Sequence, residues 1–188
     1  MKIAIVGAHG SGKSTILSSV YSELKKNNIR VSLAPEVARS SLFLAAHENI
    51  PKMQMDLFGR QISSEMTNSR NCDVLLCDRS LFDILMYTRM FFNNNNEAMN
   101  FAHSMESFCK HYAHTYNHIF LTTKLYNPSI VKDDIRPINV EEQKKASVEL
   151  KKLLDNLSIG YTALGTDPVN EIANWIKADL TNAGTAIR

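Results

Sequence analysis

The sequence has few cysteines, few glycines and prolines, and no excess of charge of either sign. Its 188 residues include three cysteines, seven glycines and five prolines, and 21 basic and 19 acidic side chains leave a net charge of +2. This composition excludes collagen-like, disordered and low-complexity chains. It also argues against a strongly basic nucleic-acid-binding protein, so that we expect no nucleic-acid partner. The cysteines form no C-x-x-C pair, which favours free thiols in a reducing compartment.

Long apolar runs are absent as well. No stretch approaches the roughly 18 residues of a transmembrane helix. The apolar run 3–6 is shorter than the roughly 7 to 15 residues of a signal peptide, and glycine and lysine follow it instead of a cleavage site. We therefore expect a cytoplasmic protein without a membrane partner.

Short apolar runs alternate with amphipathic stretches along the whole chain. The apolar runs predict strands, and the stretches with apolar residues at helical spacing predict helices. This alternation predicts one α/β domain over residues 1–188, with about five parallel strands and helices on both faces. The predicted strands are 3–6, 30–34, 74–77, 118–121 and 160–164. The predicted helices are 14–26, 37–47, 53–71, 81–92, 97–116, 141–157 and one that begins at 167–168, with a frayed tail after residue 181.

The clearest motif lies between the first strand and the first helix. Residues 7–14 read GAHGSGKS, which matches the phosphate-binding loop (Walker A) G-x-x-x-x-G-K-[ST]. Glycines let the backbone N–H groups curl around phosphate oxygens, and the following helix adds its positive N-terminal end. The lysine reaches the β- and γ-phosphates. The predicted nucleotide-binding residues are Gly7, His9, Gly10, Ser11, Gly12, Lys13, Ser14 and Thr15.

A magnesium site is predicted beside this loop. The Ser14 hydroxyl is the expected first ligand, because Mg²⁺ prefers oxygen donors and keeps several waters. Asp78 follows a fully apolar strand, and ligands of α/β proteins bind at the carboxyl ends of such strands. Asp78 is therefore predicted to contact Mg²⁺ or substrate, with a helix N-cap as the alternative.

Features elsewhere distinguish the classes of phosphate-loop protein. A GTPase needs an N-K-x-D motif after its fourth strand, where this chain reads LTTKL. A small-molecule kinase needs a carboxylate near the end of strand two, an Asp-Arg pair after strand three and an arginine in a lid. The chain offers Glu36, Asp78–Arg79 and Arg136 at those places, the last within a polar loop, 127–139, that is predicted to be a mobile lid.

Three segments carry a resemblance to a known family. PEVAR at 35–39, DRSLFD at 78–83 and DIR at 134–136 resemble the AAA-type ribosylnicotinamide kinase domain of bifunctional NMN adenylyltransferases. More broadly the chain is similar to nucleoside and nucleoside-monophosphate kinases. The resemblance implies a P-loop NTPase fold with ATP and Mg²⁺ as cofactors. No adenylyltransferase half is present, so the substrate does not carry over.

The resemblance also implies roles for the matched residues. Glu36 would face the acceptor hydroxyl, Arg39 and Arg79 would hold substrate or phosphate, and Arg136 would move in with the lid. Alternatives stay open for several of them. Glu36 is also placed to cap the next helix, both Arg39 and Arg79 are candidates for ion pairs with acidic residues, and Asp83 either orients Arg79 or touches ligand. The general base is either Glu36 or Asp78.

The functional expectation is a Mg-ATP-dependent kinase that acts on a small nucleoside- or nucleotide-like acceptor. Two alternatives belong to other classes. One is a P-loop ATPase or regulatory switch whose output is a conformational change. The other is a polynucleotide 5′-kinase, against which the balanced charge argues. The acceptor, the preference for ATP or GTP, and the oligomeric state, for which a homodimer is one option, are left open.

Overall fold

The structure is a computed structural model that describes residues 1–45, 50–92, 94–125 and 139–185. A five-stranded parallel sheet lies at its centre, with the strand order β2-β3-β1-β4-β5. The predicted α/β class and parallel sheet are confirmed. The strands are β1 (Lys2–Val6), β2 (Val31–Ala34), β3 (Val74–Asp78), β4 (His118–Leu121) and β5 (Thr162–Ala163).

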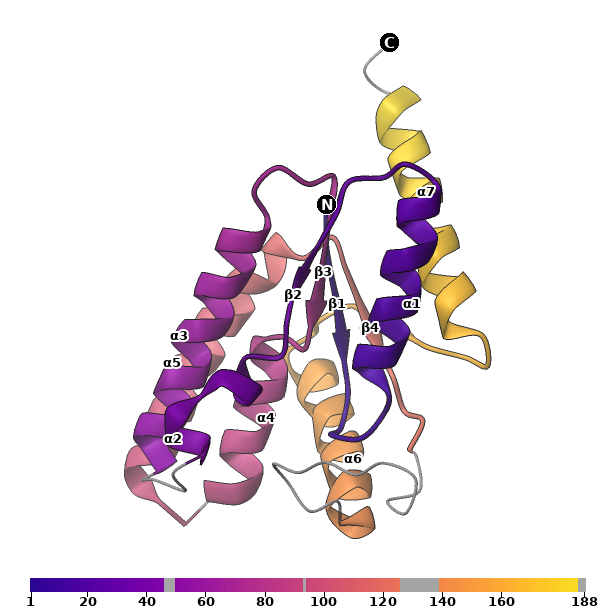
Figure 1. Cartoon of the computed structure of the whole chain (residues 1–188). Helices are drawn as coiled ribbons and strands as arrows, with labels where there is room; N and C mark the ends of the chain where they lie inside the picture. Colours follow the sequence, from indigo (N-terminus) through magenta and orange to yellow (C-terminus); the bar gives the residue numbers. More distant parts are fainter. Residues whose placement is uncertain (46–49, 93, 126–138, 186–188) are drawn as a thin grey trace.

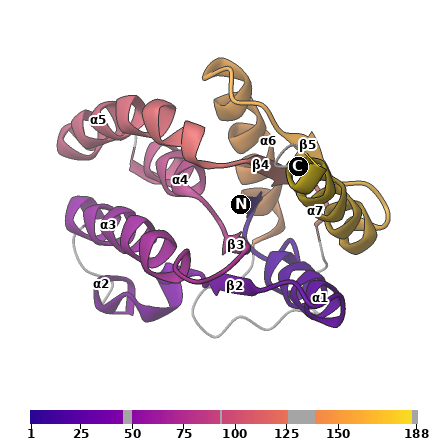
Figure 2. The same ribbon diagram turned by 90° about the horizontal axis from the view of Figure 1, so that it is seen from above.

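Helices cover both faces of the sheet (Figures 1 and 2). They are α1 (Lys13–Lys26), α2 (Leu42–Ala45), α3 (Ile50–Asn68), α4 (Leu81–Phe92), α5 (Asn96–Tyr112), α6 (Val140–Asn156) and α7 (Pro168–Thr185). Two 3₁₀ turns, η1 (Val37–Ser40) and η2 (Ala113–Thr115), complete the described elements. Among these described helices, none is long and apolar enough to cross a membrane.

Two hydrophobic cores follow from the alternation of side chains along the strands. Ile3 and Ile5 of β1 belong to the core beneath α1 and α7, whereas Ala4 and Val6 belong to the core that α3, α4, α5 and α6 cover. Successive side chains of a strand point to opposite faces, so a strand that is apolar throughout must be covered on both sides. The continuous apolar runs of the sequence are therefore explained by a sheet whose strands are covered on both faces.

The segment 37–47, predicted as one helix, is built differently. It contains the 3₁₀ turn η1 and the short helix α2, and Ser41 between them has extended backbone angles. The Ser41 hydroxyl is buried and donates to Asp56 Oδ2 of α3 at 2.8 Å. This contact with a distant residue explains the break, because local apolar spacing carries no information about it.

Smaller differences concern the ends of elements. Helix α3 begins and ends three residues earlier than predicted, and α5 gives way to η2 at its C-terminal end. Strand β5 is reduced to two residues at the edge of the sheet. The predicted fraying after residue 181 is wrong up to Thr185, because α7 continues to that residue while packing against α1. Most of the predicted lid, including Arg136, lies outside the described residues.

The order of the strands determines where a ligand site can form. Strand β1 lies between β3 and β4, although β2 follows it in the chain, so the chain changes direction across the sheet at β1. Ligands of open α/β sheets bind outside the carboxyl ends of the strands at such a switch point. The loop after β1 and the residues after β2 and β3 leave the sheet at this edge.

Candidate nucleotide and acceptor site

The loop between β1 and α1 packs closely against the segment that follows β4. At Gly7, a Cβ atom would lie 2.8 Å from the carbonyl oxygen of Thr122, the residue after β4, so a larger residue does not fit. Gly12 ends the loop with a φ of 78°, a left-handed conformation that glycine adopts without strain. These two glycines let the loop turn sharply from the sheet into the helix.

The helix that follows presents its N-terminal end to the loop. Gly12 is its N-cap residue, no side chain of the described chain caps it, and its first turn has no acidic residue. Ser14 and Thr15, two of the predicted nucleotide-binding residues, lie exposed in this first turn. The N–H groups and positive dipole at the start of a helix favour an anion. The geometry thus suits a phosphate group.

Lys13 folds back over the loop. Its ammonium donates to the carbonyl oxygens of Gly7 (3.0 Å) and Ala8 (2.6 Å) and to the hydroxyl of Ser11 (3.1 Å). The side chain is buried, with 4% of the residue's surface exposed. The cation therefore sits inside the loop, against neutral oxygen atoms.

Lys13 is electrostatically linked to the surrounding charged groups. Burial is the main cause that lowers the pKa of Lys13 from its usual 10.5 to about 7, and the Arg79 cation adds to it. Three carboxylates oppose this shift, those of Asp83, Asp78 and Glu36. An additional negative charge beside the ammonium would stabilise its charged form.

Ser14 and Asp78 meet as the sequence predicts. The Ser14 hydroxyl donates to Asp78 Oδ2 at 2.5 Å. The other carboxylate oxygen, Oδ1, is buried and has no hydrogen-bond partner among the described residues. Asp78 is the last residue of β3, so the side chain is not a helix N-cap in this structure. A hydroxyl and a carboxylate side by side form a pair of hard oxygen donors.

Glu36 follows β2 and turns toward two arginines. Its Oε1 accepts from Arg79 Nε at 2.7 Å and its Oε2 from Arg39 Nε at 3.2 Å. Although Glu36 occupies the N-cap position of η1, its side chain makes no capping bond. Burial raises the pKa of Glu36, but Arg79 and Lys13 outweigh burial and bring it from 4.5 to about 2. Glu36 is thus an ionised carboxylate at the edge of the sheet.

The two arginines differ in environment. The Arg39 side chain is 57% exposed and forms an ion pair with Glu36. This arrangement matches the alternative in which Arg39 pairs with an acidic residue at the surface. Arg79 is buried and has a φ of 80°, which is uncommon for a residue with a side chain. Burial alone would lower the pKa of Arg79, but the charge of Glu36 holds it above the usual value. Strained backbone of this kind clusters at functional sites.

Asp83, one helical turn beyond Arg79, is completely buried. It accepts hydrogen bonds from Gly7 N–H (3.2 Å), from Ser80 N–H (2.8 Å) and from the Ser80 hydroxyl (3.0 Å), and it lies 3.9 Å from the Arg79 guanidinium. Burial raises the pKa of Asp83, and Arg79 opposes this. These bonds fix Gly7 and Ser80, whereas Arg79 Nη1 makes no hydrogen bond within the described residues, so the orientation of Arg79 by Asp83 stays a prediction.

Two residues that hold the loop escaped the sequence analysis. The Tyr87 hydroxyl of α4 and the Gln143 amide of α6 both contact His9. Both residues lie inside helices in which the spacing of apolar residues predicts core packing and no contact with the loop. Their roles appear only when the helices are placed on the sheet. The i, i+4 spacing of Tyr87 from Asp83 is the one local hint, since such residues share a helix face.

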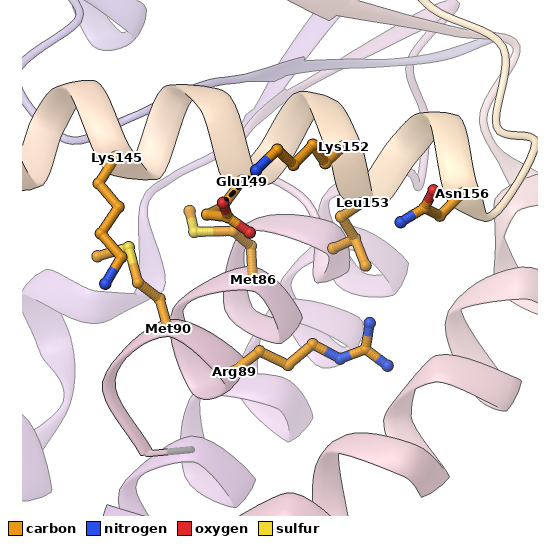
Figure 3. A pocket seen from close by; sticks show the side chains of 8 residues that line it. All are labelled: Met86, Arg89, Met90, Lys145, Glu149, Lys152, Leu153 and Asn156. Atoms are coloured by element: carbon orange, nitrogen blue, oxygen red, sulfur yellow. Dashed lines mark hydrogen bonds and ion pairs between the residues drawn. The ribbon is translucent and has the colours of Figure 1, made fainter.

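A cavity lies apart from this site. It has a volume of about 340 Å³ between α4 and α6, and none of the predicted site residues lines it (Figure 3). Its lining residues are Met86, Arg89, Met90, Lys145, Glu149, Lys152, Leu153 and Asn156.

The structure thus brings together most of the side chains that the sequence singles out. Lys13, Ser14, Asp78, Arg79 and Glu36 contact one another or act on each other's pKa at the carboxyl edge of β1, β2 and β3. The predicted lid arginine, Arg136, lies outside the described residues.

Comparison with known proteins bears on the fold. No curated protein sequence matched this chain. Two solved structures of a deoxyadenosine kinase from M. mycoides are similar in structure, one with the products dCMP and a flexible dCDP and one with dATP. Both have a TM-score of 0.64 and are matched over 100% of their length; they cover 97% and 96% of this chain with 16% and 17% identity.

A third similar structure is the NadR protein in complex with NR, with a TM-score of 0.62 and 16% identity over 88% of this chain. The chain spans 46% of that protein's length. At these identities the likeness shows the fold alone, which is that of P-loop nucleoside kinases. A family model described as an AAA domain matches residues 2–171. The chain belongs to this AAA-domain family and has a P-loop, nucleoside-kinase-like fold.

Proposed function

We propose that this protein is a Mg-ATP-dependent kinase that transfers the γ-phosphoryl group to a hydroxyl of a nucleoside- or nucleotide-like acceptor. The observation that carries the proposal is the position of Glu36. The carboxylate lies at the same edge of the sheet as the phosphate loop, held by buried Arg79 and close enough to Lys13 for each to change the other's pKa. A phosphate loop alone suits any nucleotide-binding protein, whereas an acceptor carboxylate opposite it suits a kinase.

The phosphate loop would hold the triphosphate. Lys13 would turn its ammonium toward the β- and γ-phosphates, whose negative charge would raise its lowered pKa and keep it protonated. The uncapped start of α1 would bind phosphate oxygens through its N–H groups. Phosphoryl transfer depends mainly on such positioning and on charge stabilisation.

The residues present fit a magnesium ion. Ser14 Oγ and the Asp78 carboxylate would hold it, since both are oxygen donors and Asp78 Oδ1 is a buried acceptor without a hydrogen-bond partner in the described part of the chain. Mg²⁺ is usually bound by one or two protein oxygens together with phosphates and water. When bound, it would neutralise charge on the β- and γ-phosphates.

Glu36 would orient the acceptor. With a pKa of about 2, it is a weak base in the ground state, and its main task would be to accept a hydrogen bond from the attacking hydroxyl and aim it at the phosphorus. The proton would move to the carboxylate late, as the new bond makes the hydroxyl acidic. Asp78 would hold magnesium together with Ser14, so Glu36 is the better candidate for this role.

The remaining parts of the proposal rest on the sequence. Arg79 and Arg39 would bind acceptor or phosphate oxygens beside Glu36, and Arg136 would close over the phosphates from a lid at 127–139. We take residues 1–188 as one kinase-like domain. The three cysteines, all free thiols, support action in the reducing cytoplasm.

A phosphotransfer screen tests the proposal. Purified protein is incubated with Mg-ATP and a panel of nucleosides, nucleoside monophosphates and vitamin-type ribosides, and phosphorylated product is measured over many turnovers. The Lys13→Ala variant is the control. Multiple turnover of one acceptor by the natural protein alone supports the kinase, whereas slow ATP hydrolysis without any phosphorylated acceptor favours a nucleotide-dependent switch.

A further inference from the structure

The third residue of the phosphate loop is held from two sides. The His9 backbone N–H donates to the hydroxyl of Tyr87 on α4 at 2.9 Å, and His9 Nδ1 lies 2.9 Å from the same oxygen. On the other side, Gln143 Nε2 of α6 donates to the His9 carbonyl oxygen at 3.0 Å. All three residues are buried. A residue held at both its N–H and its carbonyl, and thus through both of its peptide groups, has little freedom to move.

Tyr87 also reaches the acceptor half of the site. Its ring lies beneath Arg79, whose guanidinium carbon is 5.8 Å from the ring centroid. Arg79 in turn donates to Glu36 at 2.7 Å. The hydroxyl of one tyrosine therefore contacts the phosphate loop while its ring contacts the arginine that binds the candidate acceptor carboxylate.

Helix α4 presents a single face to the loop. Asp83 and Tyr87 are four residues apart and share that face, and they bond to Gly7 N–H and His9 N–H respectively. These two N–H groups are occupied, but by fixing them the helix holds the other N–H groups of the loop in place for phosphate. Preorganised donors stabilise phosphate charge better than mobile ones, because no reorganisation is needed during the reaction. The face of α4 thus fixes the first and third residues of the loop.

The bonds through His9 add polar contacts to the direct packing of α4 against α6. Met86 of α4 and Leu153 of α6 belong to one hydrophobic core, and both also border the cavity of about 340 Å³ between the helices (Figure 3). The loop is therefore joined by hydrogen bonds to two helices that pack on each other.

We propose that Tyr87 is a positioning residue that joins the two halves of the site. Its hydroxyl fixes the loop for the triphosphate, and its ring fixes Arg79 for the acceptor. Tyr87 itself needs no contact with either substrate. This inference rests on the proposed kinase function for its acceptor half, while its nucleotide half requires only that the loop binds ATP.

Two substitutions separate the two contacts. Tyr87→Phe removes the hydroxyl, with both of its contacts to His9, and keeps the ring. Mg-ATP affinity, measured by calorimetric titration, should therefore fall about threefold to tenfold. The KM for the acceptor should stay unchanged. Tyr87→Leu also removes the ring, so the acceptor KM should rise as well. If Tyr87 served only the stability of the fold, loss of the hydroxyl would not affect Mg-ATP binding alone, and loss of the ring would not add a specific effect on the acceptor KM.

Tyr116→Phe is the matched control. Tyr116 and Tyr87 are both 8% exposed, but the Tyr116 hydroxyl donates to Glu65, away from the loop. The control should bind Mg-ATP like the natural protein. Unchanged affinity in Tyr87→Phe, or an equal loss in Tyr116→Phe, would overturn the proposal. If the natural protein phosphorylates no acceptor, the proposed kinase function is wrong, but the Mg-ATP titration of Tyr87→Phe still decides the role of the Tyr87 hydroxyl. The same titration decides it if Tyr87→Leu does not fold.

Discussion

A half-buried lysine, Lys2, and a buried lysine, Lys13, lie in the two regions at opposite ends of β1, and their surroundings differ. Lys2, at the start of the strand, forms an ion pair with Glu65 at 2.8 Å. Its ammonium also lies 4.2 Å and 4.1 Å from the ring centroids of Tyr112 and Tyr116. Among the described residues, the ammonium of Lys13, after the strand, hydrogen-bonds to two carbonyl oxygens and a hydroxyl and forms no ion pair.

The carboxylates at the two ends differ in the same way. Both oxygens of Glu65 accept hydrogen bonds: Oε1 from Tyr116 and Gln61, and Oε2 from Tyr112 and Lys2. By contrast, Asp78 Oδ1 has no such partner anywhere in the described ranges. At the Lys2 end the cation is paired with a carboxylate whose two oxygens are both hydrogen-bonded, an arrangement that serves the fold. At the Lys13 end the cation lies against neutral atoms and a carboxylate oxygen is unpaired, an arrangement that suits a ligand.

The largest expected effect tests this contrast directly. Lys13→Met keeps the length of the side chain but removes the charge, and phosphotransfer should fall roughly 100- to 1,000-fold, as for other groups that stabilise transition-state charge. Lys2→Met should leave the turnover of the folded protein unchanged while lowering the unfolding free energy by about 3 kcal/mol, because it leaves Glu65 without its cation. Turnover and chemical denaturation of both variants check this pair.

A smaller effect concerns stability and pH. Because burial lowers the pKa of Lys13 to about 7, the unfolded chain binds more protons than the folded chain between pH 7 and 10.5. Lys13 therefore destabilises the nucleotide-free protein fully below pH 7, and this cost disappears as the pH rises toward 10.5. Lys13→Met should be more stable at pH 7, by at most about 5 kcal/mol, with the difference shrinking toward pH 10.5.

Denaturation curves at several pH values measure this difference. Lys144→Met, at an exposed position of α6, controls for the substitution itself. A Lys13→Met protein that is less stable than the natural one at pH 7 would show that the ammonium is well accommodated by the loop. The contrast between the two lysines would then not hold.

The sequence predicted those parts of the molecule that depend on contiguous residues. The phosphate loop is a motif of eight residues, and the strands are unbroken apolar runs, so both are visible locally. The closeness of Glu36 and Arg79, 43 residues apart, was also predictable, because both follow parallel strands that end at one edge of the sheet.

Other features depend on tertiary contacts that no local pattern encodes. The break at Ser41 depends on Asp56 of another helix, and the contact of Gln143 with His9 spans 134 residues. The spacing of Asp83 from Arg79 suits both an orienting role and contact with a ligand. Its bonds to the N–H groups of Gly7 and Ser80 add a role in holding the loop, which this spacing does not indicate.

The most direct test of the acceptor carboxylate compares two quantities in one variant. Glu36→Gln preserves size and most hydrogen bonding but cannot take the proton of the hydroxyl. Mg-ATP affinity and the kcat for the acceptor found in the screen are measured on the same protein. Normal affinity with most of the kcat lost is the predicted result. A wild-type kcat would show that the Glu36 carboxylate serves only to hold Arg79 and that another group faces the acceptor.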